Sequence, residues 1–189
     1  VHSIQHLSSK LNQLRELAPT AAVFVSIGCY RLSEELPQVL DTHPDGLILR
    51  MDDPVISGLQ LAVMTRHVRQ AVNASGRADL PIWIVPGEIT PEDAVKLVGL
   101  GASAVAVDRW CEEIISEVES QDQQSSRYAG RRPNEQLVYD LVDEELASRV
   151  ERFKGLFNSM EYQPPSQRLA SFSTTWGKAL GIHIMSMSP

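Results

Sequence analysis

Four short apolar runs, each followed by a segment of helical pattern, limit most strongly how this chain can fold. The runs are AAVFVSIG, DGLILRM, LPIWIVPG and ASAVAV. Strands that are apolar along nearly their whole length, alternating with helices, are typical of parallel sheets that helices cover. We therefore predict an α/β fold with four parallel βα units, which occupies residues 1–118.

The connecting segments carry helix signals of their own. The third run leads into TPEDAVKLVGLGA, where Thr90 is expected to cap the helix and Pro91 to take its first position. The long segment SGLQLAVMTRHVRQAVNASG is expected to close at Gly76, whereas Pro37 is expected to interrupt the segment after the first run. A further amphipathic helix is expected before the first run.

The pattern changes after Cys111, where the strand runs stop. Residues 119–134 are polar and contain Gly and Pro, so we predict a linker there, followed by a helical extension over residues 135–189. Apolar residues recur at helical spacing from Leu137 to Met160, and this stripe needs a surface to pack against. One more short helix is predicted near the end, and its expected buried side consists of Leu169, Phe172, Trp176 and Leu180.

Charge and composition exclude several classes of function. The chain has 189 residues, 43% of them hydrophobic, and a formal net charge of -7, which gives no attraction to nucleic acid or to an anionic membrane. No apolar run reaches the roughly 18 residues of a membrane span, and the first residues lack the pattern of a signal peptide. Two cysteines are too few for a disulfide scaffold or a cysteine-built metal centre. We expect a cytoplasmic protein with no bound metal.

The opening of the chain, HSIQHLSSKLNQLRELAPTAAVFVSI, resembles the helix and strand that enter the second half of the FMN-binding barrel of glutamate synthases. In that family a Ser-Ile-x-x-Leu start, a helix, an Asn- or Ala-Pro break and a Val-x-Val strand occur in this order. The likeness continues through PDGLILRM, LPIWIVPGEITPEDAVKLVGLGA and SAVAV, which look like the sixth, seventh and eighth strands of the family, and it covers residues 2–118.

The resemblance implies that this chain supplies four of the eight strands of a TIM-type barrel. Half a barrel has two unpaired edges and an uncovered inner face, which a protein in water must hide. A second chain could carry the other half, a homodimer could complete the barrel, or the C-terminal helices could cap a flattened sheet. The stripe from Leu137 to Met160 favours the third solution or a helical dimer contact.

The resemblance also locates the residues that would bind FMN, and most of them are altered. The family loop Asp-Gly-Gly becomes Pro86-Gly87-Glu88, and the turn Gly-x-Gly-Thr becomes residues 106–109, which include Asp108 and Arg109. Ser26 stands where the family presents a lysine to the flavin. The cysteine cluster of the family's iron–sulfur centre is eroded as well. We expect no cofactor, with FMN as the alternative.

The remaining charged residues are expected at the rim of the sheet, together with Asp108 and Arg109. They are Arg50, Asp52, Asp53 and Glu88. Three interpretations stay open: a salt-bridge network that replaces the cofactor, a cation site formed by the acidic members, or FMN held in an altered geometry. No catalytic residue can be assigned.

These observations predict a divergent glutamate-synthase-like domain that has lost FMN and acts as a non-catalytic binding or assembly module. Its expected partners are further copies of itself or a second chain that completes the sheet. The alternative is a flavin-dependent oxidoreductase acting on glutamate-like or 2-oxo acid substrates, completed by a partner chain or a homodimer.

Overall fold

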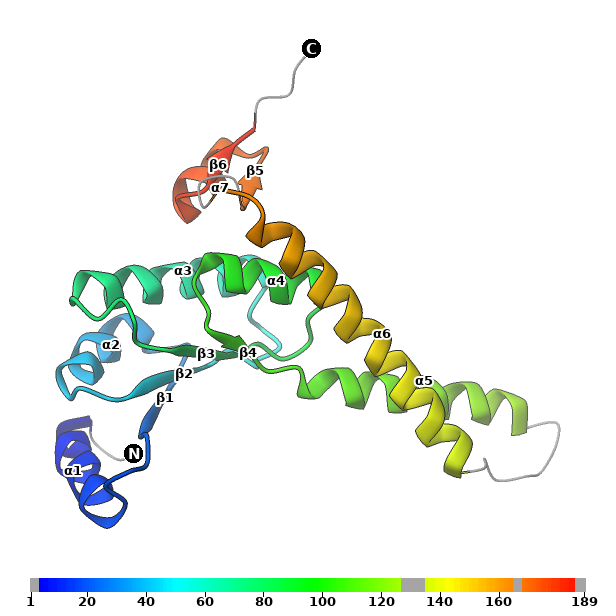
Figure 1. Cartoon of the computed structure of the whole chain (residues 1–189), viewed down its shortest axis with the longest axis horizontal. Helices are drawn as coiled ribbons and strands as arrows, with labels where there is room; N and C mark the ends of the chain where they lie inside the picture. The colour runs from blue at the N-terminus through cyan, green and yellow to red at the C-terminus, as the bar shows by residue number, and fades with distance from the viewer. Residues whose placement is uncertain (1–3, 127–134, 165–167, 186–189) are drawn as a thin grey trace.

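The computed structural model describes residues 4–126, 135–164 and 168–185 (Figure 1). Among these residues no helix is both long and apolar enough to cross a membrane. The helices and strands follow one another along the chain as η1 (Ile4–His6), α1 (Leu7–Leu17), β1 (Phe24–Gly28), α2 (Leu32–Asp41), β2 (Gly46–Arg50), α3 (Gly58–Ala74), β3 (Ile82–Val85), α4 (Pro91–Leu100), β4 (Ala104–Val105), α5 (Asp108–Ser126), α6 (Glu135–Glu161), β5 (Ala170–Ser171), α7 (Thr174–Leu180) and β6 (His183–Ile184).

Strands β1 to β4 form a parallel sheet in the order β1-β2-β3-β4. The predicted α/β class and the four parallel strands are therefore confirmed. The fourth strand is shorter than its apolar run, because the chain turns into α5 at Asp108. Thr90 caps α4 and Pro91 takes its first position, and Gly76 follows α3 with a φ of 76°, all as expected.

One face of the sheet is packed against helices. Side chains that alternate along the strands, such as Val25, Leu47 and Ile82, are buried on this face. Figure 1 shows α3 and α4 above the sheet, with α2 beside α3. Helix α2 runs without a break through Pro37, so the expected interruption there is wrong. Pro37 is exposed, and its ring costs the helix one hydrogen bond without ending it.

The opposite face of the sheet is open. The strand register places Ser26, Ile48, Trp83 and Ala104 in one row across the four strands. Ser26 and Ala104 are exposed, and 44% of the Trp83 surface remains accessible in the middle of the row. In Figure 1 no described helix lies below the strands between α1 and α5. The sheet is thus covered on one side only.

A glycine allows an aromatic pair to form at one end of this open face. The ring centroids of Phe24 on β1 and Trp83 on β3 are 4.5 Å apart, so Phe24 reaches across β2. Gly46 on β2 is paired with Phe24, and a Cβ atom at Gly46 would lie 2.1 Å from the Phe24 ring. The absence of a side chain at Gly46 therefore permits the contact.

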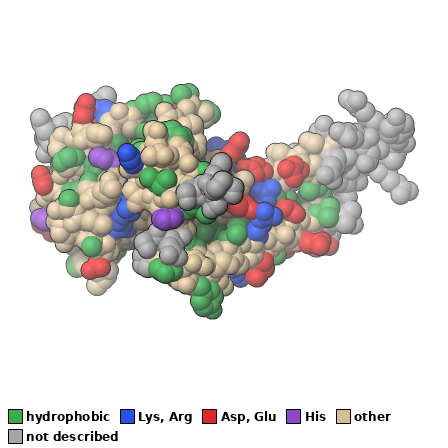
Figure 2. Space-filling view, turned by 90° about the horizontal axis from the view of Figure 1, so that it is seen from above, with side chains coloured by type: hydrophobic (Ala, Val, Ile, Leu, Met, Phe, Trp, Pro, Cys, Tyr) green, Lys and Arg blue, Asp and Glu red, His purple; other side chains and the backbone are tan. Residues whose placement is uncertain are grey.

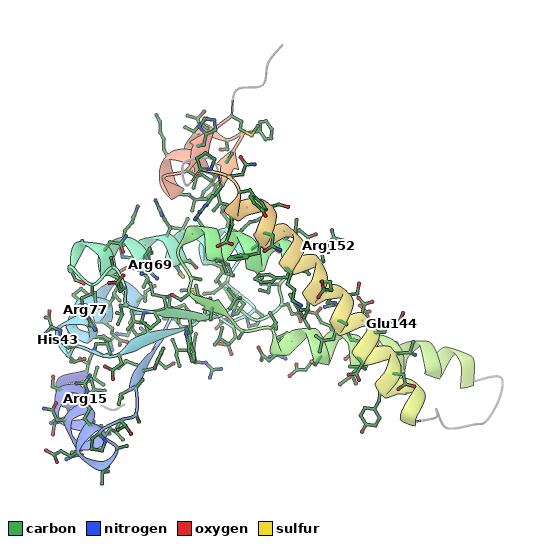
Figure 3. All side chains as sticks on the ribbon, in the orientation of Figure 1. Arg15, His43, Arg69, Arg77, Glu144 and Arg152 are labelled. Atoms are coloured by element: carbon green, nitrogen blue, oxygen red, sulfur yellow. The ribbon has the colours of Figure 1, made fainter. Side chains whose placement is uncertain are left out.

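Arginines tie the loops together at the end of the sheet where the strands begin (Figure 3). Arg69 on α3 donates hydrogen bonds to the carbonyls of Gly101 at 2.8 Å and Ala78 at 2.9 Å. Arg15 donates to the carbonyl of His43 at 2.6 Å, and Arg77 reaches another carbonyl in the same loop. Burial lowers the pKa of Arg69 from its ordinary value. These contacts hold the loops that precede the strands, so this end of the sheet has a structural role.

The helical extension packs on helices, so the solution in which the C-terminal helices cap the sheet is wrong for the described residues, whereas the alternative of a helical dimer contact stays a prediction. Helix α6 lies along α4 and α5. Arg149 pairs with Glu113 of α5 at 2.7 Å, and Arg152 pairs with Glu92 of α4. Leu146, Val150 and Phe153 of the stripe pack against the core and Met160 is buried, whereas Leu141 is exposed. The far parts of α5 and α6 project as an arm, along which Figure 2 shows acidic and basic side chains interspersed.

The linker and the last helix differ in part from the expectation. Residues 119–126 continue α5, and residues 127–134 lie outside the described residues. A final helix forms as α7, and Leu180 is buried as expected, but Phe172 is 63% exposed. The short parallel pair β5 and β6 that flanks α7 was not predicted, because strands of only two residues carry no recognisable pattern.

Candidate functional site

The predicted rim residues lie where the strands of the parallel sheet end. All four strands run in one direction, so the loops after β1, β2, β3 and β4 emerge at the same edge. Arg50 is the last residue of β2, Asp52 and Asp53 follow it, and Gly87 lies in the loop after β3. Asp108 and Arg109 open α5 just after β4. This edge is the place where functional residues of such folds are found.

The best-formed contact at the rim joins Arg50 and Asp52. The guanidinium of Arg50 donates to the carboxylate of Asp52 at 2.6 Å. This hydrogen bond holds the pKa of Asp52 below its ordinary value and raises the pKa of Arg50. The charge of Arg109 lowers the pKa of Asp52 further, which places Arg109 within electrostatic reach. Asp52 is therefore ionised at neutral pH.

Asp53 has different partners, and one of them was missed in the sequence. The Tyr30 hydroxyl donates to Asp53, and the backbone N–H of Val55 donates to the same carboxylate at 2.9 Å. Both bonds lower the pKa of Asp53, the Tyr30 bond most. Tyr30 comes two residues after the end of β1, so its position at the carboxyl end of a strand was the available signal.

Arg109 is held by a residue of its own helix. It pairs with Glu112 of α5, and this contact is the main reason why the pKa of Arg109 is raised. The carboxylates of Asp108 and Glu88 raise it further. The rim therefore consists of ion pairs between residues that are close in the sequence, and weaker electrostatic attraction acts between these pairs. Of the three interpretations, the salt-bridge network is the one that this geometry supports.

Gly87 and Ser26 lie in different parts of the structure. Gly87 has a φ of 78°, and a Cβ atom there would lie 3.4 Å from the Cα of Asp52, so this glycine lets the two loops pack closely. Ser26 lies on the open face of the sheet in register with Ile48. The structure brings Gly87 next to the rim carboxylates, whereas Ser26 belongs to the row that contains Trp83.

The rim does not fit the phosphate of a flavin nucleotide. A phosphate site at a helix start needs free N–H groups and no competing negative charge. Asp108 is the first residue of α5 and brings a carboxylate to that helix start, while Arg109 is engaged by Glu112. Repulsion between a carboxylate and a phosphate about 4 Å apart costs about 1 to 4 kcal/mol at effective dielectric constants of about 80 to 20.

The rim carboxylates of Asp52 and Asp53 are already engaged in hydrogen bonds. In the part of the chain that the structure describes, no three His, Cys, Asp or Glu side chains are grouped so that they could hold a metal ion. Asp52 and Asp53 bond to Arg50 and Tyr30. A general base works best with a pKa near the operating pH, so two carboxylates with lowered pKa values are weak candidates for proton transfer.

Comparison of this chain with protein-family models, with curated proteins and with solved structures finds no match.

Proposed function

We propose that this chain is a non-catalytic assembly module, half of a TIM-type barrel whose open face binds a second copy of the chain. The observation that carries the proposal is the uncovered row of Ser26, Ile48, Trp83 and Ala104. A large aromatic side chain exposed at the centre of a row, with smaller neighbours around it, is typical of an interface core. In a monomer this surface would face water.

The strand directions allow two copies of the chain to form one closed barrel. If the twofold axis runs parallel to the strands, β1 of one copy meets β4 of the other, and all eight strands stay parallel. Both free edges of each sheet are then paired, and the two open faces form a common interior. Helices α2, α3 and α4 stay outside, as in a barrel.

The chemistry of the rim supports a role without catalysis. Its carboxylates are engaged by Arg50 and Tyr30, and Asp108 disfavours an anion at the start of α5. On this proposal the frame derives from a glutamate-synthase-like barrel, in agreement with the resemblance over residues 2–118, and its cofactor has been lost. The two properties, assembly and loss of FMN, need separate tests.

The assembly test measures mass by size exclusion with light scattering. The wild-type chain, of 20.9 kDa, is expected to elute as a dimer. Ala104→Lys places a charge at the end of the exposed row and is expected to yield monomers that keep the wild-type circular dichroism. Asn12→Lys, at an exposed position of α1, is the matched control and stays dimeric. A monomeric wild type, or identical elution of both variants, refutes the proposal.

The cofactor test measures retained flavin. The protein is incubated with FMN and passed through a desalting column, and its visible spectrum is recorded. We expect no flavin absorption in the protein fraction. A flavin band that stays with the protein, and that Asp108→Asn strengthens, would instead support the flavin-dependent oxidoreductase.

A further inference from the structure

A hollow lies on the helix side of the molecule, away from the open sheet face. It is a cavity of about 470 Å³ between α3, α4, the loop after β3 and the C-terminal segment that contains α7. Small-molecule sites commonly have volumes of about 300 to 1,000 Å³ and lie between elements from different parts of a chain. The cavity meets both conditions, because the C-terminal segment forms one of its walls and α3 and α4 form others.

Hydrocarbon side chains form most of its walls. Leu61 of α3, Leu97 and Leu100 of α4 and Leu180 of α7 are buried there. Trp176 also lines the cavity and remains 38% exposed. Burying an apolar ligand against such walls yields about 25 cal/mol per Å² of apolar surface removed from water. The cavity therefore favours a largely apolar or aromatic occupant.

The charged residues that line the cavity determine which charge the polar end of a ligand can carry. The ammonium of Lys96 bonds to Asp93 at 2.9 Å, so these two charges neutralise each other. Thr90 donates to the same carboxylate of Asp93, also at 2.9 Å. Among the lining residues Glu88 is the remaining charge and is negative, and the Arg109 that it attracts at the rim does not line the cavity. An anionic ligand would meet this charge at the wall, whereas a neutral or cationic ligand would not.

We propose that this cavity is a binding site for a small, largely apolar organic molecule whose polar end is uncharged or cationic. The site uses the outer side of the helix layer, so it is independent of assembly through the open face. Helices α3 and α4 supply its fixed walls, and the segment from Leu169 to Ile182 supplies the remaining wall. Ligand binding is expected to hold this segment more firmly against α3.

The test uses Nile red, an uncharged apolar dye, titrated into the full chain. A saturable rise in dye fluorescence is expected, with weaker binding of the anionic dye anilinonaphthalene sulfonate. Ala62→Phe fills the cavity from α3 and is expected to weaken Nile red binding by about tenfold or more. Ala170→Phe fills it from β5 and serves as the second variant if Ala62→Phe fails to fold.

Trp83→Ser is the matched control, because it removes the exposed aromatic residue of the open sheet face and leaves the cavity intact. Nile red binding that survives Trp83→Ser but falls in the cavity-filling variants supports the site. Binding that survives a folded cavity-filling variant, or that is lost in a Trp83→Ser variant with wild-type circular dichroism, overturns it, since the dye would then occupy another apolar surface. Equal or tighter binding of the anionic dye overturns the inferred charge preference.

Discussion

Gly46→Ala is expected to destabilise the sheet although it adds only one methyl group. The new Cβ atom would lie 2.1 Å from the Phe24 ring, a distance that no folded protein tolerates, so Phe24 has to leave its place beside Trp83. Overpacking costs about 1 to 3 kcal/mol. Loss of the aromatic pair adds about 0.5 to 1.5 kcal/mol. We therefore expect the free energy of unfolding to fall by about 2 kcal/mol or more.

The measurement is urea unfolding at one fixed protein concentration, followed by tryptophan fluorescence. Gly28→Ala is the matched control, since Gly28 is in the same strand as Phe24 and a Cβ atom there has nothing within 4 Å. Its effect should stay within about 0.5 kcal/mol. The double variant Phe24→Leu with Gly46→Ala should lose much less than the sum of the single changes. Equal effects of the two glycine changes, or strict additivity with Phe24→Leu, would refute the reasoning.

Three further predictions concern stability. Trp110→Phe removes the indole N–H that donates to a buried carbonyl at 2.7 Å, and thermal or urea unfolding should show a loss of about 1 to 3 kcal/mol. Arg69→Met leaves the carbonyl of Gly101 without its donor, and a loss of similar size is expected, with wild-type stability arguing against the structural role. Because the pKa of Asp52 is lowered on folding, its contribution to stability is present above the unfolded pKa of about 3.9 and disappears as the pH falls through the folded pKa. The stability of Asp52→Asn should therefore change less than that of the wild type below about pH 4, and parallel curves would contradict this.

Much of the fold could be predicted because its signals are local. Apolar runs separated by helical segments identify a parallel sheet, and Thr90 with Pro91 identifies the start of α4 within a few residues. The location of the rim follows from the same logic, since parallel strands end at one edge. These features depend on residues that are neighbours in the sequence.

The remaining features depend on contacts between distant segments. The stripe of α6 predicts a helix with an apolar side, but nothing in its sequence states that the side packs on α4 and α5 and leaves the sheet open. The stacking of Phe24 on Trp83 requires the register of three strands, and the cavity requires the C-terminal segment to return to α3. Tyr30 carries no charge, so the pattern of charged residues at the strand ends does not point to it, and its bond to Asp53 depends on the fold.

The arginine contacts at the end of the sheet where the strands begin have a consequence for acid unfolding. Arg69 and Arg77 donate to backbone carbonyls, which do not titrate, whereas the opposite rim is held by Arg50 bonded to a carboxylate that protonates in acid. At the end where the strands begin, one titrating group is Asp45, which accepts from the Val23 N–H at 2.8 Å and pairs with Arg15. Acid should therefore loosen the rim and the start of β1 and β2 before the region around Gly101 that Arg69 holds. Amide hydrogen exchange at low pH would register this as early loss of protection beyond the strand ends, while the amides around Gly101 remain slow to exchange.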